Sequence, residues 1–474
     1  MARGRSAAIL AVALRYATPT ARSFALRLPA AVPGDPTGIR GRRVPTPFSS
    51  IPPAAAPPLR SERALLVTLA VIQFTHLVDF MIMMPLGPQF MRLFGIGPQA
   101  FGWLVSSYTF AAAASGFLAA FRIDRFDRKT ALLSLYAGFV VATALCGFAP
   151  TFATLLGARV VAGAFGGVIG GLVLAIVADA VPYARRASAT AIIGMSFSLA
   201  TVLGIPLGLL LAARLSWRAP FIVLALASIG VALVAARVLP PLRGHVVAGG
   251  RAHPVAQLRA IFGVPNHRRA FALNVALMFA GFTVIPFIAA YNVANVGVSD
   301  AELAIIYFAG GTATLVTAPL IGRLADRHGK RRLFTIVGLL SIVPLLVTTH
   351  LPRVSLPVVV AVSALFYVLV PGRFGPAMTL ITGGVEPRWR GSFMTFNASI
   401  QQLGSGLASV CGGLVIGRNA DGALTRFGLV GWIAVGFTLL AIWLARRVRV
   451  VGVDAQGPDA VAPGRNWRQR HPPG

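Results

Sequence analysis

Long apolar stretches recur along this 474-residue sequence, and they constrain its fold more than any other feature. A bilayer core about 30 Å thick takes about 20 apolar residues of helix, and only an element that closes its own hydrogen bonds can cross lipid. We therefore expect an all-α membrane protein with twelve transmembrane helices. The expected spans lie near residues 64–86, 101–121, 131–149, 152–181, 187–213, 219–239, 270–292, 302–321, 333–350, 355–381, 391–417 and 427–445.

Composition excludes several other classes of protein. Only 12% of the residues are charged and the mean hydropathy is +0.76, whereas about a quarter of the residues in soluble proteins are charged. A net charge of +30 raises nucleic-acid binding as a hypothesis, but the cations lie in short connectors and tails without the interleaved aromatic residues of a nucleic-acid groove. The sequence also lacks an H-E-x-x-H motif and a Cys/His cluster, so we expect no enzyme, no cofactor and no metal.

The distribution of Arg and Lys among the connectors predicts the orientation in the membrane. The even-numbered connectors carry most of these cations, and the odd-numbered ones carry only Arg92, Arg214, Arg218, Arg353, Arg418 and Arg426. The positive-inside rule then puts both termini in the cytoplasm of a multi-pass protein of the cell inner membrane. An even number of spans agrees with this orientation.

The chain divides into five parts. Residues 1–63 are basic and rich in Pro and Ala, and we expect a disordered cytoplasmic tail there. Two six-helix bundles should follow at 64–240 and 270–448, separated by a cytoplasmic connector at 241–269 and followed by a cytoplasmic tail at 449–474.

Two connectors share a charged pattern. The run 322-GRLADRHGKRR-332 matches 120-AFRIDRFDRK-129, 202 residues earlier, so spans 1–6 and 7–12 look like two copies of one unit. A glycine at the turn can adopt a positive φ, and a second glycine allows close backbone approach. The candidate gating residues in these loops are Gly322, Asp326, Arg327, Gly329 and Arg331, together with Asp124 and Arg125.

The pattern G-x-x-x-D-R-x-G-x-R-R from Gly322 to Arg332 resembles the signature cytoplasmic loop of the major facilitator superfamily. The first copy departs from it, because Ala120 and Asp127 replace the two glycines. This resemblance implies two pseudo-symmetric six-helix bundles that rock about a central site. It also implies that Asp326 and its neighbouring Arg latch the cytoplasmic ends together when the cavity opens outward. The alternative is a charged turn that only sets topology.

Ionisable residues inside the spans are candidates for proton coupling. Span 1 holds His76 and Asp79 one turn apart. An ionised Asp near the bilayer centre costs about 2.5 to 3.5 kcal/mol, so it usually faces a bundle interior or a wet cavity. Asp79 could take up a proton on one side and release it on the other, or it could be structural. Arg159, followed by Gly163, resembles the span 4 motif of the superfamily, in which the Arg assists proton relay.

A Gly-Pro-rich segment in span 5, 194-GMSFSLATVLGIPLGLLL-211, bears on the direction of transport. Gly204, Pro206 and Gly208, with Trp217-Arg218 after them, resemble the stretch that marks the sugar-efflux and drug-efflux antiporters of the superfamily. Pro206 should kink the helix, because it removes one backbone hydrogen bond. Ordinary helix packing is the alternative interpretation.

Polar residues in the last spans are candidates for lining a substrate cavity: Asn397, Gln401 and Ser405 on one face of span 11, and Arg373 in span 10. Hydrogen bonding between helices would explain the polar face equally well. We expect a monomeric transporter that exports a small organic molecule in exchange for protons across the lipid bilayer. Proton-coupled uptake is the near alternative. The alternatives from other classes are a transport-inactive membrane sensor and an intramembrane enzyme.

Overall fold

The structure, a computed structural model, describes residues 59–121, 123–182, 185–242, 254–386 and 389–450. Most of the tails expected at 1–63 and 449–474, and part of the connector at 241–269, lie outside these residues. In the first half the elements are α3 Leu59–Ile82, α4 Gly87–Leu93, α5 Pro98–Ala119, η1 Ile123–Arg125, α6 Arg128–Phe148, α7 Phe152–Ala180, α8 Arg186–Leu199, η3 Ala200–Gly204, α9 Ile205–Arg214 and α10 Ala219–Val238.

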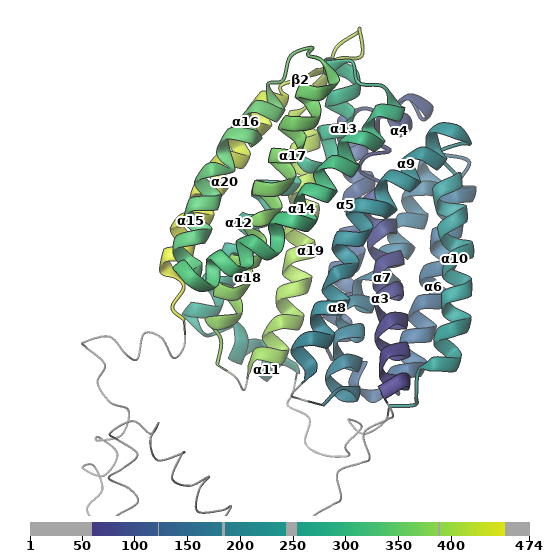
Figure 1. Ribbon diagram of the computed structural model, residues 1–474, viewed down its shortest axis with the longest axis vertical. Helices are drawn as coiled ribbons and strands as arrows, with labels where there is room; N and C mark the ends of the chain where they lie inside the picture. The colour runs from purple at the N-terminus through teal and green to yellow at the C-terminus, as the bar shows by residue number, and fades with distance from the viewer. Residues whose placement is uncertain (1–58, 122, 183–184, 243–253, 387–388, 451–474) are drawn as a thin grey trace, which may run out of the picture. The chain divides into compact units, whose positions relative to one another are not determined.

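The second half begins with α11 at the connector and contains the small β-hairpin of the described residues (Figure 1). Its elements are α11 Pro254–Phe262, α12 Pro265–Phe282, η4 Ile285–Phe287, α13 Ile288–Tyr291, η5 Asn292–Val296, α14 Asp300–His328, α15 Lys330–Leu340, α16 Ile342–Thr349, α17 Leu356–Gly372, α18 Phe374–Gly383, α19 Arg390–Val415, β1 Gly417–Arg418, β2 Leu424–Thr425 and α20 Phe427–Arg447. The two strands are antiparallel, with Gly417 opposite Thr425.

Eleven helical segments among the described residues are long and apolar enough to cross a membrane. Twelve were expected. The segment that falls short is α19, which occupies the expected eleventh span but carries Asn397, Gln401, Gln402 and several serines. Its 26 residues are long enough to span, and it packs along α5 and α12 within the bundle. Polar residues on a helix surrounded by other helices avoid contact with lipid.

Several spans are interrupted where proline removes a backbone donor. The fifth span consists of α8, the π-helical turn η3 and α9, with Pro206 just after the π turn. The tenth span is split into α17 and α18. Pro371 lies near the end of α17 and Pro376 near the start of α18, so the break between the helices has a proline on each side. The predicted kink at Pro206 thus takes the form of a π turn, in which Ile205 donates to the carbonyl of Ala200.

The expected loop at 322–332 is almost entirely helical, which corrects the sequence-based boundary. Helix α14 continues to His328 and α15 begins at Lys330, so only Gly329 separates them. Gly329 has a φ of +87°, as the tight turn requires. Gly322, Asp326 and Arg327 therefore lie on the last turns of α14, because a helix can extend into the polar region as long as its side chains are solvated.

The two halves share one large hydrophobic core at one end of the molecule. We call the end with η1, α11 and Gly329 the basic end, and the end with α4, α13 and the β-hairpin the opposite end (Figure 1). At the opposite end one cluster combines residues of both halves, among them Phe101, Phe221, Phe287 and Phe366. Toward the basic end the fully buried residues form one cluster in each half, and Phe117 of α5 and Phe121 just after this helix pack against the cluster of the second half.

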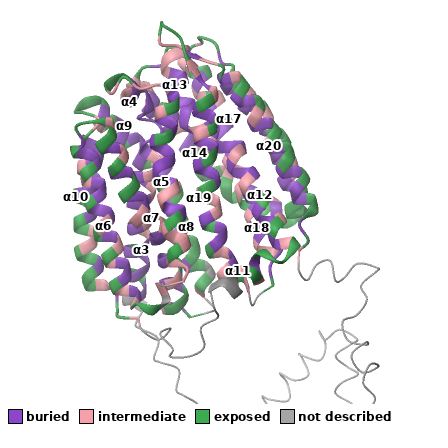
Figure 2. Ribbon diagram, turned by 180° about the vertical axis from the view of Figure 1, so that it is seen from behind, coloured by how far each residue is buried: buried purple, intermediate pink, exposed green. Residues whose placement is uncertain are grey.

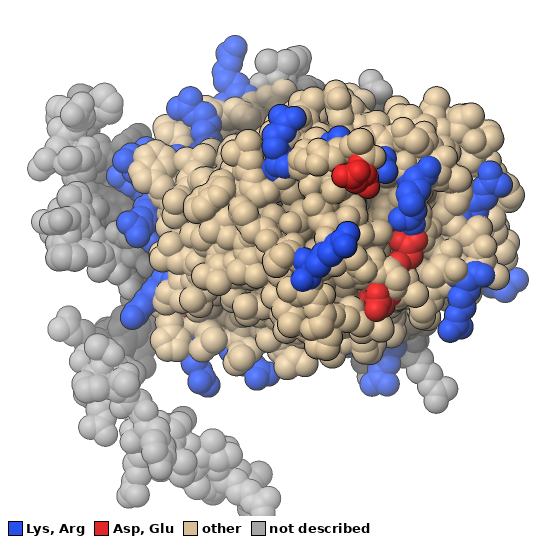
Figure 3. Space-filling view, turned by 90° about the horizontal axis from the view of Figure 1, so that it is seen from above, with Lys and Arg blue, Asp and Glu red and all other residues tan. Residues whose placement is uncertain are grey.

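Exposed apolar side chains cover the outer helices, as expected for contact with lipid. Leu226 and Leu233 on α10 and Leu440 and Trp443 on α20 are examples, and Figure 2 shows both helices with exposed outer faces. Figure 3 looks onto the molecule from above, where the acidic side chains lie in the right-hand part of the face with basic side chains near them. The described basic end, in contrast, carries mainly Arg and Lys on η1, α14 and α15.

Candidate functional site

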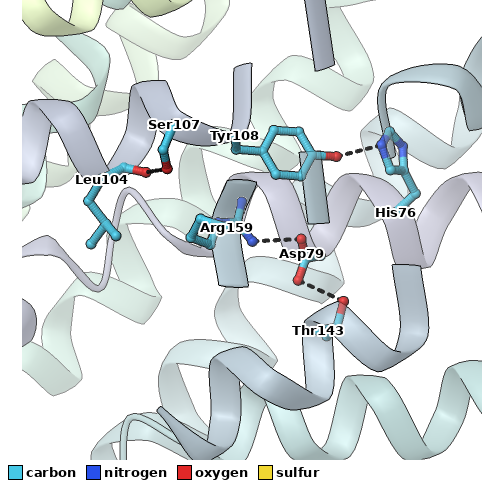
Figure 4. A network of polar contacts seen from close by, with 7 residues as sticks. All are labelled: His76, Asp79, Leu104, Ser107, Tyr108, Thr143 and Arg159. Carbon is cyan, nitrogen blue, oxygen red and sulfur yellow. Dashed lines mark hydrogen bonds and ion pairs between the residues drawn. The ribbon is translucent and has the colours of Figure 1, made fainter. Parts of the chain in front are cut away.

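A buried ion pair lies in the middle of the first half. Arg159 on α7 donates from Nη1 to Asp79 Oδ2 on α3 at 2.7 Å, and the two side chains are 1% and 0% exposed. Thr143 on α6 donates to the other carboxylate oxygen of Asp79 at 3.1 Å (Figure 4). Three helices thus converge on one carboxyl group. Removing water from two charges costs several kcal/mol per ion, so such a pair needs this complete set of partners.

His76 and Tyr108 extend this ion pair into a polar network (Figure 4). The Tyr108 hydroxyl lies 2.7 Å from His76 Nε2, and the guanidinium of Arg159 lies 4.5 Å from the centre of the Tyr108 ring. A cation above an aromatic face is attracted to it. The structure therefore brings together His76, Asp79 and Arg159, the three residues that the sequence suggested for proton coupling.

Two glycines of α7 allow the close packing that holds this network. A Cβ on Gly163 would lie 2.1 Å from the carbonyl oxygen of Tyr108. A Cβ on Gly166 would lie 2.2 Å from the Tyr108 hydroxyl and 3.0 Å from His76 Nε2. Helix α7 can therefore approach α5 and α3 this closely only with glycine at both positions.

The Gly-Pro segment of the fifth span packs against the same part of α3. A Cβ on Gly204 would lie 2.2 Å from Val78 Cγ2, and one on Gly208 would lie 2.6 Å from Ile82 Cδ1. Val78 precedes Asp79 directly. The π turn η3 also contacts the second half, where Gly311 of α14 lies against the Thr201 carbonyl. The segment therefore touches both the helix that carries Asp79 and a helix of the other half.

Arg373 is a buried cation of the second half and has different partners. It is 2% exposed and donates to the Ala280 carbonyl, Thr438 Oγ1 and Ser341 Oγ at 2.8, 2.8 and 3.3 Å. The offset of 202 residues between the two repeats puts Gly281 where the first half has Asp79. Carbonyl and hydroxyl oxygens thus surround Arg373, and its side chain lies inside the second bundle.

The polar face of α19 contributes to contacts between helices. Asn274 of α12 donates to Asn397 Oδ1 at 2.9 Å, and Asn397 is buried. Ser405 donates to the Gln401 carbonyl in its own helix, and Gln401 is half-buried. These contacts favour the second interpretation of the face, hydrogen bonding between and within helices.

The gating residues of the second repeat face solvent at the basic end. Asp326 is exposed and lies 3.8 Å from Lys330, one turn further along the chain. Arg327 is exposed as well, and Arg331 donates to the Val448 carbonyl at 2.8 Å. In the first repeat Arg125 is exposed in η1, and the Asp124 side chain lies outside the described part of the structure. Among the residues that the structure describes, Asp326 therefore has a partner only within its own half.

Sequence reasoning missed two contacts that the structure brings out. Thr143 is a single hydroxyl in an apolar span, and its position opposite Asp79 could be found only from the packing of α6 on α3. Arg92, which precedes α5, forms an ion pair with Asp300 at the start of α14, across the two halves at the opposite end. Arg92 is a single cation in a connector with few charges, and this was the sequence feature that could have indicated an ion pair there.

These features define a class of protein. Two helical bundles share a core at one end and are joined through α5 and α19 at the other, and one bundle encloses a charged network. Such an arrangement is that of a secondary transporter of small molecules, and not of an enzyme.

The chain belongs to the Major Facilitator Superfamily, whose family profile matches residues 69–282 and 270–471. Among its relatives are the MFS-type transporter YceJ of Bacillus subtilis, 25% identical over 75% of this chain and 90% of that protein, and the inner membrane transport protein YdhP of Escherichia coli, 26% identical over 77% and 91%.

Solved structures with the same fold include a bacterial homologue of the human lysosomal transporter Spinster in an inward-facing, unoccupied conformation, with a TM-score of 0.64, 17% identity and coverage of 82% of this chain and 98% of that one. A D-xylose-proton symporter has a TM-score of 0.66, 16% identity and coverage of 81% and 97%. The expected fold class, two bundles of membrane-spanning helices, is confirmed.

Proposed function

We propose that this transporter exports a small organic molecule in exchange for protons. It would act as a monomer in the cell inner membrane, with the basic end and both termini in the cytoplasm. The observation that carries the proposal is the Asp79–Arg159 pair, the carboxylate of which is fully buried and held by three helices. An acid at this depth is costly, and such residues commonly mark proton pathways.

A proton on Asp79 would change the partners of every group in the network. A neutral carboxyl group no longer compensates the charge of Arg159, so protonation weakens the contact between α3 and α7. His76 contacts the network through its hydrogen bond with the Tyr108 hydroxyl, and the Tyr108 ring lies against the Arg159 guanidinium, so a shift of Arg159 would be felt at His76. The geometry therefore supports a network with two states that a proton selects.

Alternating access follows from the way in which the halves meet. At the opposite end the halves share one core, whereas toward the basic end they stay in contact between α5 and α19 and leave a cavity between α8 and α14. This difference supports a conformation that is more open at the basic end. Among the described residues, Asp326 pairs only with Lys330 in this conformation. In the outward-opening conformation, the basic ends of the halves would close and Asp326 and Arg327 would contact the other half.

The proposed direction is supported by the Gly204–Gly208 segment. Its glycines bring α9 and η3 into contact with α3 beside Asp79, and this tight seam excludes water from the first bundle. A seal at this position would limit proton leak during exchange. The likeness of this segment to the antiporter stretch of the superfamily points the same way.

Everted membrane vesicles with an acidic lumen test the proposal. Addition of an exported solute should release protons from the lumen, which is measured as recovery of quenched acridine orange fluorescence. A panel of structurally diverse solutes is needed, because the substrate is not specified by the proposal. Asp79→Asn should abolish this release, whereas the control Asp421→Asn, in an exposed turn beside the β-hairpin, should retain it.

Two outcomes would contradict the proposal. Solute accumulation that follows the proton gradient only in right-side-out vesicles would make the protein an uptake symporter. If no solute in a broad panel moves protons in either orientation, although the protein is folded and inserted, a transport-inactive sensor becomes the better interpretation.

A further inference from the structure

A cavity of about 380 Å³ lies between the two halves toward the basic end. Its walls come from α8 of the first half and from α14, α17 and α18 of the second, and α14 lies between α8 and α18 in Figure 1. Cavities of 300 to 1,000 Å³ commonly hold small organic ligands. The volume therefore suits a small molecule of one or two rings.

The cavity wall is apolar apart from hydroxyl groups. Phe197 of α8 and Phe374 of α18 contribute aromatic rings. Three threonines line the space, and each already donates its hydrogen: Thr314 to the Gly310 or Tyr367 carbonyl at 2.9 Å, Thr317 to Ala313 at 2.7 Å and Thr379 to Gly375 at 3.0 Å. A hydroxyl group that donates in this way keeps its oxygen lone pairs as acceptors.

Two prolines in the tenth span leave helical carbonyls without their usual donors. Pro371 cannot donate to the Tyr367 carbonyl, and Thr314 of α14 donates there instead. Pro376 cannot donate to the carbonyl of Gly372, which lines the cavity. Irregular backbone at membrane depth is tolerated where it is buried or lines a cavity. The walls therefore provide acceptors from the threonines and from the broken helix.

The charged residues of the cavity lie at one end. Asp326 and Lys330 form its rim and lie 3.8 Å apart, close enough to neutralise each other. The buried charges at Asp79, Arg159 and Arg373 belong to the interiors of the two bundles, and none of them is among the lining residues. A charged ligand would lose its hydration inside this cavity and gain no counter-ion.

We propose that this cavity binds uncharged, mainly apolar organic molecules that carry hydroxyl or amide N–H donors, and that these molecules are the substrate class. The proposal rests on the proposed transport function for its physiological meaning, but the binding itself needs no proton gradient. The aromatic and aliphatic walls hold the apolar part of the molecule. The threonine oxygens and the Gly372 carbonyl accept hydrogen bonds from its donors.

Binding of four naphthalene compounds to the full-length protein in lipid nanodiscs tests the proposal. The set comprises naphthaleneethanol, its methyl ether, naphthaleneethylammonium and naphthaleneacetate, which share a ring system and differ in charge and donors. Equilibrium dialysis gives each Kd after subtraction of binding to empty nanodiscs. We expect the alcohol to bind most tightly, the ether about fivefold more weakly because it lacks a donor, and the two ions at least tenfold more weakly.

A matched pair of glycine variants locates the site. A Cβ on Gly375, which lines the cavity, meets no atom within 4 Å, so Gly375→Val fills the cavity without a clash at Cβ. Gly230 on α10 is equally open but lies on the exposed face of its helix, so Gly230→Val is the control. Gly375→Val should weaken binding of the alcohol tenfold or more, and Gly230→Val should leave its Kd unchanged.

Three results would overturn the proposal: tighter binding of either ion than of the alcohol, no binding of any compound above that of empty nanodiscs, or an unchanged Kd for the alcohol in Gly375→Val. The failure of proton coupling is a separate result. If Asp79→Asn loses proton exchange in vesicles but binds naphthaleneethanol normally, the binding site stands apart from the coupling. If the unaltered protein exchanges protons in vesicles but none of the four compounds binds to it, the binding proposal fails and the proposed coupling stands.

Discussion

The buried pair of Asp79 and Arg159 makes a quantitative prediction about stability. At 2.7 Å, two unit charges attract each other by about 6 kcal/mol for an effective dielectric constant of about 20. Most of this attraction offsets the loss of hydration of both ions. A single substitution therefore measures the free-energy cost of leaving the other ion buried without its partner. Removal of one partner from a buried pair costs about 3 to 5 kcal/mol. We expect that loss of unfolding free energy for Asp79→Asn and for Arg159→Gln.

The double variant separates pairing from the other effects of each substitution. With Asn at 79 and Gln at 159, neither charge remains buried, and the two amides can form a hydrogen bond with each other. We expect its loss to be smaller than that of either single variant, which gives a coupling energy of at least about 3 kcal/mol. Unfolding in detergent micelles titrated with dodecyl sulfate measures these values, and the exposed Asp421→Asn variant should change them by less than about 0.5 kcal/mol.

Transport by the same variants distinguishes stability from coupling. The double variant should regain stability but release no protons from everted vesicles, because it has no carboxyl group to carry them. Additive losses in the two single variants would refute the pairing argument. Proton-coupled transport by the double variant would remove Asp79 from the proposed mechanism.

Packing in the structure leads to further predictions. Gly166→Ala places a methyl group 2.2 Å from the Tyr108 hydroxyl and should cost about 1 to 3 kcal/mol of unfolding free energy, and Tyr108→Phe in the same chain should recover part of that loss. Gly204→Ala places Cβ 2.2 Å from Val78 Cγ2, so it should slow transport. Val78→Ala in the same chain removes the clash and should restore the transport rate in vesicles. A rate that stays low would show that Gly204 is needed for flexibility and not for packing. Gly311→Ala brings Cβ to 3.0 Å from the Thr201 carbonyl. It should reduce the transport rate severalfold and leave the Kd for naphthaleneethanol unchanged. A normal transport rate would show that this contact has no part in coupling the two halves. Arg92 and Asp300 can both be replaced by cysteines and joined with a reversible thiol cross-linker. The cross-link should hold the opposite end closed and stop transport until a reductant is added. Transport by the cross-linked protein would show that this contact need not open.

The arrangement of spans could be predicted from the sequence because the bilayer imposes a simple length rule on apolar helices. The predicted segments agree with the described helices for most of the chain, including 219–239 against α10 Ala219–Val238. The error at 322–332 has a physical cause, since the hydropathy of a segment shows where it leaves the lipid but not where its helix ends. Only a helix terminator such as Gly329 marks that end.

The candidate site could be predicted only in part. An Asp in an apolar span is an expensive residue, and this cost made Asp79 a candidate for proton coupling. Arg159 was a candidate through its resemblance to the span 4 motif, and its pairing with Asp79 appears only in the structure. The contribution of Thr143 depends on how α6 is rotated, and no pattern in one span specifies that rotation. For Arg373, position in the span gave no way to distinguish the bundle interior from a cavity, and the structure places it among oxygens of Ala280, Thr438 and Ser341.

The two repeats divide the proposed work between them. In the first, α7 carries an Arg that has a carboxylate partner, and this pair can respond to a proton. In the second, Arg373 binds oxygens that do not titrate in the physiological range, and the cavity for an uncharged solute lies mainly on α14, α17 and α18. A proton in one half can influence a solute in the other only through elements that touch both. The π turn η3 is such an element, because Gly204 at its end packs on Val78 and Thr201 within it meets Gly311. We therefore expect η3 to transmit part of the proposed coupling, because an irregular turn can change its hydrogen bonding at lower cost than a regular helix can.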